Sequence, residues 1–294
     1  MTGWDGIEEA VAVDATGSFA KAAASLGVST SHVSRAIARL EDIVQAPIFH
    51  RTTRRVVVTE AGRALIEQFR LVIQTRDVAL ASISPDGEPQ GSIKVTCSTA
   101  LGERFVAPII RQFAIDHPRI SVFLDLTNRV VDLIGEGYDL AVRTGQLVDS
   151  RLTATRIASR GLRTCASPSY LEARGTPQLV ADLGNHECLI GSSATWHFTE
   201  SSNDVIYRPQ GRWRCNNGGV VLEAAISGIG ICQLPDFYVR TALNDGRLIP
   251  VLTPFRPSDE AIWAIYPQRR HLLPKVRKLV EMLRLHLPRY LDLL

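Results

Sequence analysis

A short segment rich in proline and glycine divides the 294-residue chain into two parts with different sequence patterns. Residues 84–91 read Ser-Pro-Asp-Gly-Glu-Pro-Gln-Gly, a composition typical of a linker. Residues 4–83 have a helical pattern almost throughout. Beyond residue 91, runs of alternating apolar residues, which are typical of strands, are interleaved with helical stretches. The sequence therefore predicts a helical part followed by an α/β part with mainly parallel sheets.

Two helices joined by a tight turn are predicted near the N-terminus. Ser18 can cap the first helix, residues 19–26 are rich in alanine, and Gly27 can end it. In the second helix, the apolar residues that share one face are Val33, Ile37, Leu40 and Val44. The opposite face is small, polar and cationic, and carries Ser31, His32, Arg35, Ala38 and Arg39. Because small side chains let a helix enter the major groove and arginine can bind guanine or phosphate, this pattern predicts a helix-turn-helix.

The alternative for such a helix pair is ordinary bundle packing, and the charge of the region does not decide between them. Residues 1–62 hold six Lys or Arg against seven Asp or Glu. The segment that follows favours DNA binding. Residues 50–55, His-Arg-Thr-Thr-Arg-Arg, lie between the apolar Ile48-Phe49 and the β-branched run 56–58. This pattern predicts a β-hairpin wing that lays three arginines along a phosphate backbone.

A long helix is predicted from its cap, Thr59, to about Ile83. Its apolar stripe has the spacing of a coiled-coil seam, is interrupted by Arg76, and includes Leu65, Phe69, Val72 and Ala79. We expect this stripe to form a dimer seam. Packing of the helix on its own domain is the alternative.

These residues resemble the N-terminal signature of the LysR-type transcriptional regulators. The resemblance rests on Gly17-Ser18-Phe19, Ala22-Ala23, Leu26, Val28-Ser29, Val33-Ser34-Arg35, Ile37, Arg39-Leu40-Glu41, Phe49, Arg51 and Thr59-Glu60-Ala61-Gly62. Thr30-Ser31 depart from the family pattern, which most often has Gln-Pro there. The residues expected to contact DNA are Ser29, Thr30, Ser31, His32, Ser34, Arg35 and Arg39 on the second helix, and Arg51, Thr52, Arg54 and Arg55 on the wing.

The resemblance also implies a domain plan. Residues 1–58 would form the winged helix-turn-helix, residues 59–83 the linker helix, residues 84–91 the hinge, and residues 92–294 a periplasmic-binding-protein-like effector domain. Two α/β lobes would enclose the ligand cleft, one made of residues 92–162 and 266–294 and the other of residues 163–265. The family resemblance further implies a bacterial homodimer that associates into tetramers on a double-stranded DNA operator.

Polar residues stand where predicted strands of the second part end. Ligands of open α/β sheets bind at the carboxyl ends of strands, and free N–H groups at helix starts favour anions. The residues expected to bind a small anionic effector, such as an organic acid, are Ser98, Thr99, Asn128, Arg143, Thr144, Asn216 and Asn217. The alternative for the hydroxyl and amide side chains is helix capping, and for Arg143 a structural ion pair.

Composition excludes several other classes. The net charge of +3 neither requires nor forbids a polyanionic partner, and the five cysteines and seven histidines form no metal-ligand or catalytic motif. We therefore expect no enzyme activity, no metal and no cofactor. The N-terminus lacks the pattern of a signal peptide and no apolar run is long enough to span a membrane, so we expect a cytoplasmic protein. Two alternatives remain: a redox-sensing regulator that uses Cys97 or Cys215, and a solute-binding protein of the same two-lobed fold.

Overall fold

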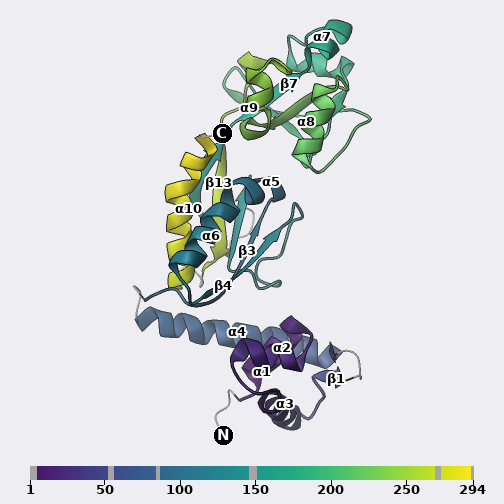
Figure 1. Ribbon diagram of the computed structural model, residues 1–294. Helices are drawn as coiled ribbons and strands as arrows, with labels where there is room; N and C mark the ends of the chain where they lie inside the picture. Colours follow the sequence, from purple (N-terminus) through teal and green to yellow (C-terminus); the bar gives the residue numbers. More distant parts are fainter. Residues whose placement is uncertain (1–4, 52–55, 84–86, 146–150, 269–272, 293–294) are drawn as a thin grey trace. The chain divides into compact units, whose positions relative to one another are not determined.

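The computed structural model describes residues 5–51, 56–83, 87–145, 151–268 and 273–292 (Figure 1). The chain forms two compact units, Met1–Gly87 and Glu88–Leu294, so the boundary falls within the predicted linker. Over the described ranges, no helix combines the length and the apolar character that a membrane crossing requires.

The N-terminal unit consists of helices and a short hairpin. Its elements are α1 (Ile7–Thr16), α2 (Phe19–Leu26), α3 (Thr30–Val44), β1 (Phe49–Arg51), β2 (Val56–Val58) and α4 (Glu60–Ile83). Ser18 and Ser29 cap α2 and α3 as predicted, since their hydroxyls accept hydrogen bonds from the N–H groups of Lys21 and His32. β1 pairs antiparallel with β2, which confirms the backbone of the predicted hairpin.

The apolar face of α3 is buried as predicted. Val33 and Ile37 are fully buried and pack with Ile7, Val13 and Ile48 in the core of this unit. α2 and α3 therefore form a helix-turn-helix whose polar face remains exposed to solvent.

The linker helix α4 is fastened to this core. Phe69 is only 9% exposed and Leu65 packs against the same apolar cluster. Arg76, which interrupts the apolar stripe, pairs with Glu8 of α1, and Arg70 pairs with Asp14. Leu65 and Phe69 thus face their own unit, the arrangement that the sequence left open as the alternative to a seam. Val72 remains 36% exposed.

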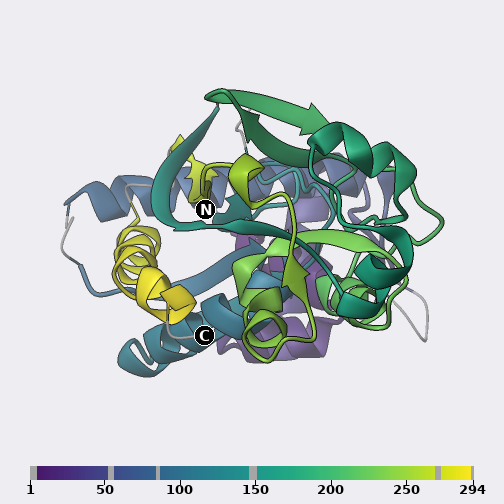
Figure 2. The same cartoon turned by 90° about the horizontal axis from the view of Figure 1, so that it is seen from above.

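The first lobe of the C-terminal unit is a five-stranded sheet covered by helices. The strand order is β4-β3-β5-β13-β6, with β3 (Gly91–Cys97), β4 (Ile120–Leu126), β5 (Leu140–Thr144), β6 (Leu152–Arg160) and β13 (Glu260–Pro267). A continuous helical stretch consists of α5 (Thr99–Leu101), a π-helical turn (Gly102–Val106) and α6 (Ala107–Asp116). α6 packs beside the last helix, α10 (Pro274–Asp292), and the two lie together in both views (Figures 1 and 2).

The second lobe has a four-stranded sheet of order β12-β7-β11-β8 and a separate hairpin. Its strands are β7 (Leu162–Ala166), β8 (Cys188–Leu189), β11 (Ile231–Pro235) and β12 (Ile249–Pro250), and the hairpin is β9 (Trp196–Glu200) with β10 (Asn203–Tyr207). Its helices are α7 (Pro168–Arg174), α8 (Gly218–Ile226) and α9 (Asp236–Asn244), with 3₁₀ turns at Val180–Asn185 and Thr253–Phe255.

Two expectations about this unit were wrong. The sheets are mixed rather than mainly parallel: β3 runs parallel to β4 and β5, but β13 runs antiparallel to both its neighbours and β7 is antiparallel to β11. The lobe boundary expected at 265/266 is also misplaced, because all of β13 belongs to the first lobe. The chain leaves the first lobe after β6 and returns through β13 at the same edge of the sheet, which accounts for the antiparallel strands of the first lobe and for the misplaced boundary.

Gly161 lies at the first crossover between the lobes, where space is tight. A Cβ there would lie 2.2 Å from Arg256 Nη2 and 2.3 Å from Asp236 Oδ2. Asp236 also pairs with Arg163 and Arg256, and its N–H donates to the Gly161 carbonyl. The crossover is therefore closely packed, and a larger residue at position 161 would have to displace the ion pair of Asp236 and Arg256.

Candidate functional site

The polar face of α3 is the candidate DNA-reading surface. Ser31, Arg35 and Arg39 are exposed and His32 is half-buried, while Val33, Ala36, Ile37 and Leu40 on the opposite side are buried. Arg35 Nε donates to the Ser31 carbonyl at 3.2 Å. That contact orients the guanidinium and leaves its two terminal nitrogens for another acceptor, as bidentate recognition of guanine requires.

Acidic residues preceding α1 or within it contact two other side chains of this face. His32 Nε2 lies 3.0 Å from Glu9 Oε1, and Arg39 pairs with Asp5 at 2.9 Å. A DNA phosphate would have to compete with these carboxylates. The wing residues Thr52, Arg54 and Arg55 lie outside the described residues, and only the backbone of Arg51 is placed, in β1.

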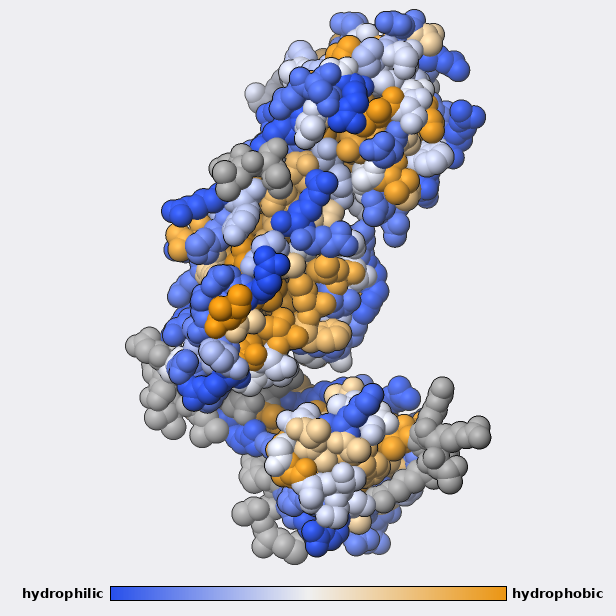
Figure 3. Space-filling model, viewed as in Figure 1, coloured by the Kyte–Doolittle hydropathy of each residue, from blue (hydrophilic) through white to orange (hydrophobic). Residues whose placement is uncertain are grey.

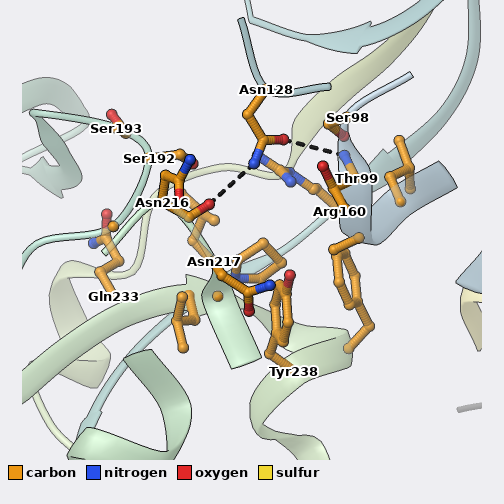
Figure 4. Close-up of a pocket in the computed structure, with 18 of the residues that line it drawn as sticks. Ser98, Thr99, Asn128, Arg160, Ser192, Ser193, Asn216, Asn217, Gln233 and Tyr238 are labelled. Carbon is orange, nitrogen blue, oxygen red and sulfur yellow. Dashed lines mark hydrogen bonds between the residues drawn. The ribbon is translucent and has the colours of Figure 1, made fainter. Parts of the chain in front are cut away.

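A cavity of about 270 Å³ lies between the two lobes of the C-terminal unit. The first lobe contributes Ser98, Thr99, Glu103, Arg104, Asn128, Arg160 and Glu260, and the second lobe contributes Ser192, Ser193, Trp196, His197, Asn216, Asn217, Gln233, Phe237 and Tyr238, among others. Figure 4 shows Ser98, Thr99 and Arg160 on one side, with Asn216 and Asn217 across from them. The structure therefore brings five of the seven predicted effector residues to one cavity.

The helix-capping alternative applies to Asn217 but not to Ser98. Ser98 precedes α5 but its side chain makes no capping hydrogen bond, whereas Asn217 caps α8 by accepting from the N–H groups of Gly219 and Val220 at 2.9 and 3.2 Å. Asn217 is thus a structural cap that also lines the cavity. The Ser98 hydroxyl does not cap a helix.

Arg143 and Thr144 do not line this cavity. Arg143 is half-buried beneath it, where its guanidinium donates to the Thr127 carbonyl and to Thr96 Oγ1. Burial lowers the pKa of Arg143. Thr144 Oγ1 accepts from Arg160 Nη2 at 3.1 Å. The first lobe therefore uses Arg143 to hold the backbone that leads to Asn128.

The cation that does line the cavity is Arg160, which sequence reasoning missed. Its Nε donates to Glu260 Oε2 at 2.9 Å, so the pair joins the ends of β6 and β13. Among the described residues no contact occupies Nη1 of Arg160. The rule that ligands bind at the ends of strands would have found Arg160, because it ends β6 just where the chain passes to the second lobe. It was missed because β6 was not predicted as a strand.

Residues 191–193, Gly-Ser-Ser, were also missed. They follow β8 as Ser98-Thr99 follow β3, so the same rule would have found them had the short strand been predicted. Arg104 and its neighbour Glu103 enter through the π-helical turn, a distortion that often marks functional sites. Such a turn leaves no trace in hydrophobic periodicity.

Of the two cysteines considered for redox sensing, Cys97 is poorly placed for it. Cys97 is fully buried, and burial raises the pKa of its thiol to about 12. The thiolate is the reactive form, so this environment disfavours oxidation. Cys215 is half-exposed. The close pair in the structure is another one, Cys165 and Cys232, whose sulfurs lie 3.5 Å apart in the core of the second lobe.

A winged helix-turn-helix joined to two α/β lobes around a cleft defines a ligand-responsive transcriptional regulator. Two family models match the chain: the LysR substrate binding domain over residues 86–288 and the bacterial regulatory helix-turn-helix protein, lysR family, over residues 4–63. The chain belongs to the LysR-type transcriptional regulators. It is a DNA-binding regulator with an effector-binding domain, and not an enzyme.

Curated relatives cover most of the chain. The HTH-type transcriptional regulator DmlR of Escherichia coli K12 is 31% identical over 273 residues, which are 90% of this chain and 88% of that protein. The HTH-type transcriptional regulator CrgA of Neisseria meningitidis serogroup C is 32% identical over 247 residues, or 82% of each chain.

Solved structures have the same fold. The full-length Vibrio cholerae virulence activator AphB matches with a TM-score of 0.59 and 26% identity, over 95% of this chain and 97% of that chain. CrgA of Neisseria meningitidis matches with a TM-score of 0.56 and 29% identity, over 96% and 99%. The similarity therefore extends over both units.

Proposed function

We propose that this protein regulates transcription in response to a small anionic effector, an organic acid, that binds in the cavity between the lobes. The observation that carries this proposal is that both lobes line one cavity with hydroxyl and amide side chains. A ligand that touches both lobes binds their alternative arrangements with different affinity, so it shifts the angle between them. Through a dimer, that shift would change the separation of the DNA-reading heads.

The chemistry of the walls favours a carboxylate held mainly by hydrogen bonds. The charges of Arg104 and Arg160 are formally balanced by Glu103 and Glu260. The guanidinium of Arg160 and the hydroxyl of Ser98, which does not cap α5, are hydrogen-bond donors at this cavity. A cavity of about 270 Å³ is small for a ligand site, which suits an acid of a few carbon atoms.

Thermal shift of the full-length protein against a panel of small mono- and dicarboxylates tests this site. The bound acid should stabilise the protein by about 2.7 kcal/mol at a hundred times its dissociation constant. Ser98→Ala and Arg160→Lys should reduce the thermal shift, because each removes a hydrogen-bond donor from the cavity. Arg160→Lys does so while keeping the positive charge. The control Ser121→Ala makes the same change at an exposed position of β4. An equal shift in all four proteins would place the ligand elsewhere.

The exposed face of α3 and the wing supply the DNA contacts in this proposal. Ser29, Thr30, Ser31, His32, Ser34, Arg35 and Arg39 would meet the major groove, and Arg51, Thr52, Arg54 and Arg55 the phosphates. Because its operator would be chromosomal DNA of a bacterium, we place the protein in the cytoplasm.

The dimer seam is proposed for the solvent side of α4, where Leu71 is 43% and Val72 36% exposed, together with Ala79. Val72→Asp should convert the dimer to monomers, because a carboxylate would be buried without a partner. Arg63→Asp is the control, since helical rotation places Arg63 opposite Val72. Sedimentation equilibrium measures both. A dimeric Val72→Asp protein would exclude this seam.

Association into tetramers is proposed through the first lobe. Apolar surface gathers over the part of that lobe that holds α6 and β4 (Figure 3). Exposed apolar side chains of these elements are Ile115 in α6 and Phe123 in β4, and Val130 follows β4 in the chain. Apolar patches of this kind are typical of protein interfaces.

A further inference from the structure

Hydrogen bonds join the two lobes at different places. In one of them, Arg240 Nη2 of α9 donates to the Leu291 carbonyl of α10 at 3.4 Å. Arg104 Nη1 donates to the Phe237 carbonyl at 2.9 Å, beside the hinge, because the preceding residue, Asp236, is bonded to Gly161 at the crossover. Asn128 Nδ2 donates to the Asn216 carbonyl at 3.0 Å. A bond beside a hinge changes little when two lobes separate, whereas a bond far from it must break.

Asn128 comes from the edge of the sheet opposite the crossovers. It follows β4, the edge strand, while the strands that carry the chain between lobes, β13 and β6, form the opposite edge of the sheet. β4 is three strand positions from β13, a separation of about 14 Å at the usual spacing of neighbouring strands. The bond between Asn128 and Asn216 therefore crosses the cleft from the edge strand opposite the crossovers.

The side-chain amide of Asn128 forms one hydrogen bond within the first lobe and one to the second lobe. Its Oδ1 accepts from the Thr99 N–H at 3.1 Å in the first lobe, while its Nδ2 reaches the second lobe (Figure 4). The residue before it is held to the sheet, since the Thr127 N–H donates to the Cys97 carbonyl and its own carbonyl accepts from Arg143. The side chain thus projects across the cleft from a fixed backbone.

We propose that Asn128 is a latch that holds the two lobes together across the cleft and is displaced by the effector. Its amide engages the Thr99 N–H and the Asn216 carbonyl, so these two polar groups of the cavity are not available to a ligand while the latch is made. This proposal rests on the proposed function, because it takes the cavity between the lobes as the effector site. It assigns Asn128 a role in lobe arrangement, and it gives Arg143 a purpose as the residue that positions the latch.

Distances between the lobes in the full-length protein without any effector test the latch. Spin labels would be attached through Glu281→Cys in α10, outside the surface proposed for tetramers, and Ile206→Cys in β10, both of which are exposed. Cys215→Ser removes the one native thiol that is not buried. Labelled chain is mixed with an excess of unlabelled chain, so that only distances within one chain contribute. Asn128→Ala should raise the population with the longer distance roughly two- to tenfold, as loss of one exposed hydrogen bond predicts.

Two further variants separate the latch from general damage. Asn128→Asp keeps an acceptor for the Thr99 N–H but loses the donor to Asn216, so it should open the lobes while hydrogen exchange at Thr99 stays slow. Asn216→Ala keeps the backbone carbonyl that receives the bond, so the distances should match those of the wild type.

An unchanged distance distribution in Asn128→Ala would overturn the latch, as would equal opening in Asn216→Ala. No effector is present in this experiment, so such a result would leave the effector site standing. Conversely, failure of every carboxylate to shift the melting temperature would overturn the proposed effector class and leave the latch intact.

Discussion

Arg35→Ala is expected to weaken binding to the operator by about 1–3 kcal/mol while binding to random duplex DNA changes little. Arg35 is exposed on α3, and its bond to the Ser31 carbonyl leaves the two terminal nitrogens to meet a base edge. The measurement is fluorescence anisotropy with a duplex that the full-length protein selects from a random pool, compared with an unselected duplex.

Arg35→Lys is the matched variant for this prediction, because it keeps the charge but loses the fork of donors. It should bind random DNA like the wild type and still lose operator affinity. Lys21→Ala removes an exposed positive charge from α2, outside the proposed reading face, and should cost less. Equal weakening of operator and random DNA in Arg35→Ala would show that Arg35 contacts phosphate and not a base.

Gly62→Ala is expected to destabilise the N-terminal unit by about 3 kcal/mol or more. A Cβ at Gly62 would lie 2.3 Å from the Ile48 carbonyl oxygen and 2.9 Å from Thr59 Oγ1, the cap of α4. The backbone of the segment that enters the wing would have to move, and overpacking of this kind typically costs about 1–3 kcal/mol or more. Urea unfolding of the full-length protein, followed by fluorescence and by DNA binding, measures the loss.

Gly17→Ala is the comparison for Gly62. Gly17 has a φ of 62°, and a Cβ there would meet none of the described residues within 4 Å. The cost is therefore conformational only, about 1 kcal/mol. If the two substitutions cost the same, close approach of α4 to the wing is not the reason for glycine at position 62.

The sequence predicted those elements whose signals are local. Capping serines, the alanine-rich α2 and the apolar spacing of α3 all act within a few residues, so the helix-turn-helix was predicted almost residue by residue. Ser98, Thr99 and Asn128 were found because β3 and β4 have clear alternation. Long-range pairing carries no such signal, and the antiparallel return of β13 beside β5 is decided by packing of distant segments.

The difference between local and long-range signals also explains which cavity residues the sequence did not predict. Arg160 was overlooked because the length of β6 depends on its pairing with β13. The sequence placed Arg143 correctly at a strand end. Its guanidinium points toward Thr96 and Thr127 and not into the cavity, because a half-buried guanidinium needs several hydrogen-bond acceptors. The apolar residues of α4 show the same limit, because one stripe can face either its own unit or a second chain.

The central claim is that an acid bound between the lobes changes how the protein engages DNA. The most direct test is titration of the selected operator at fixed ionic strength, with and without the acid that gives the largest thermal shift, for the wild type and Arg160→Lys. We predict that the acid changes the affinity or the footprint of the wild-type protein and has a reduced effect on Arg160→Lys, which should bind the operator normally without the acid. An identical response in both proteins, or a wild-type complex that does not respond to an acid it binds, would contradict the account.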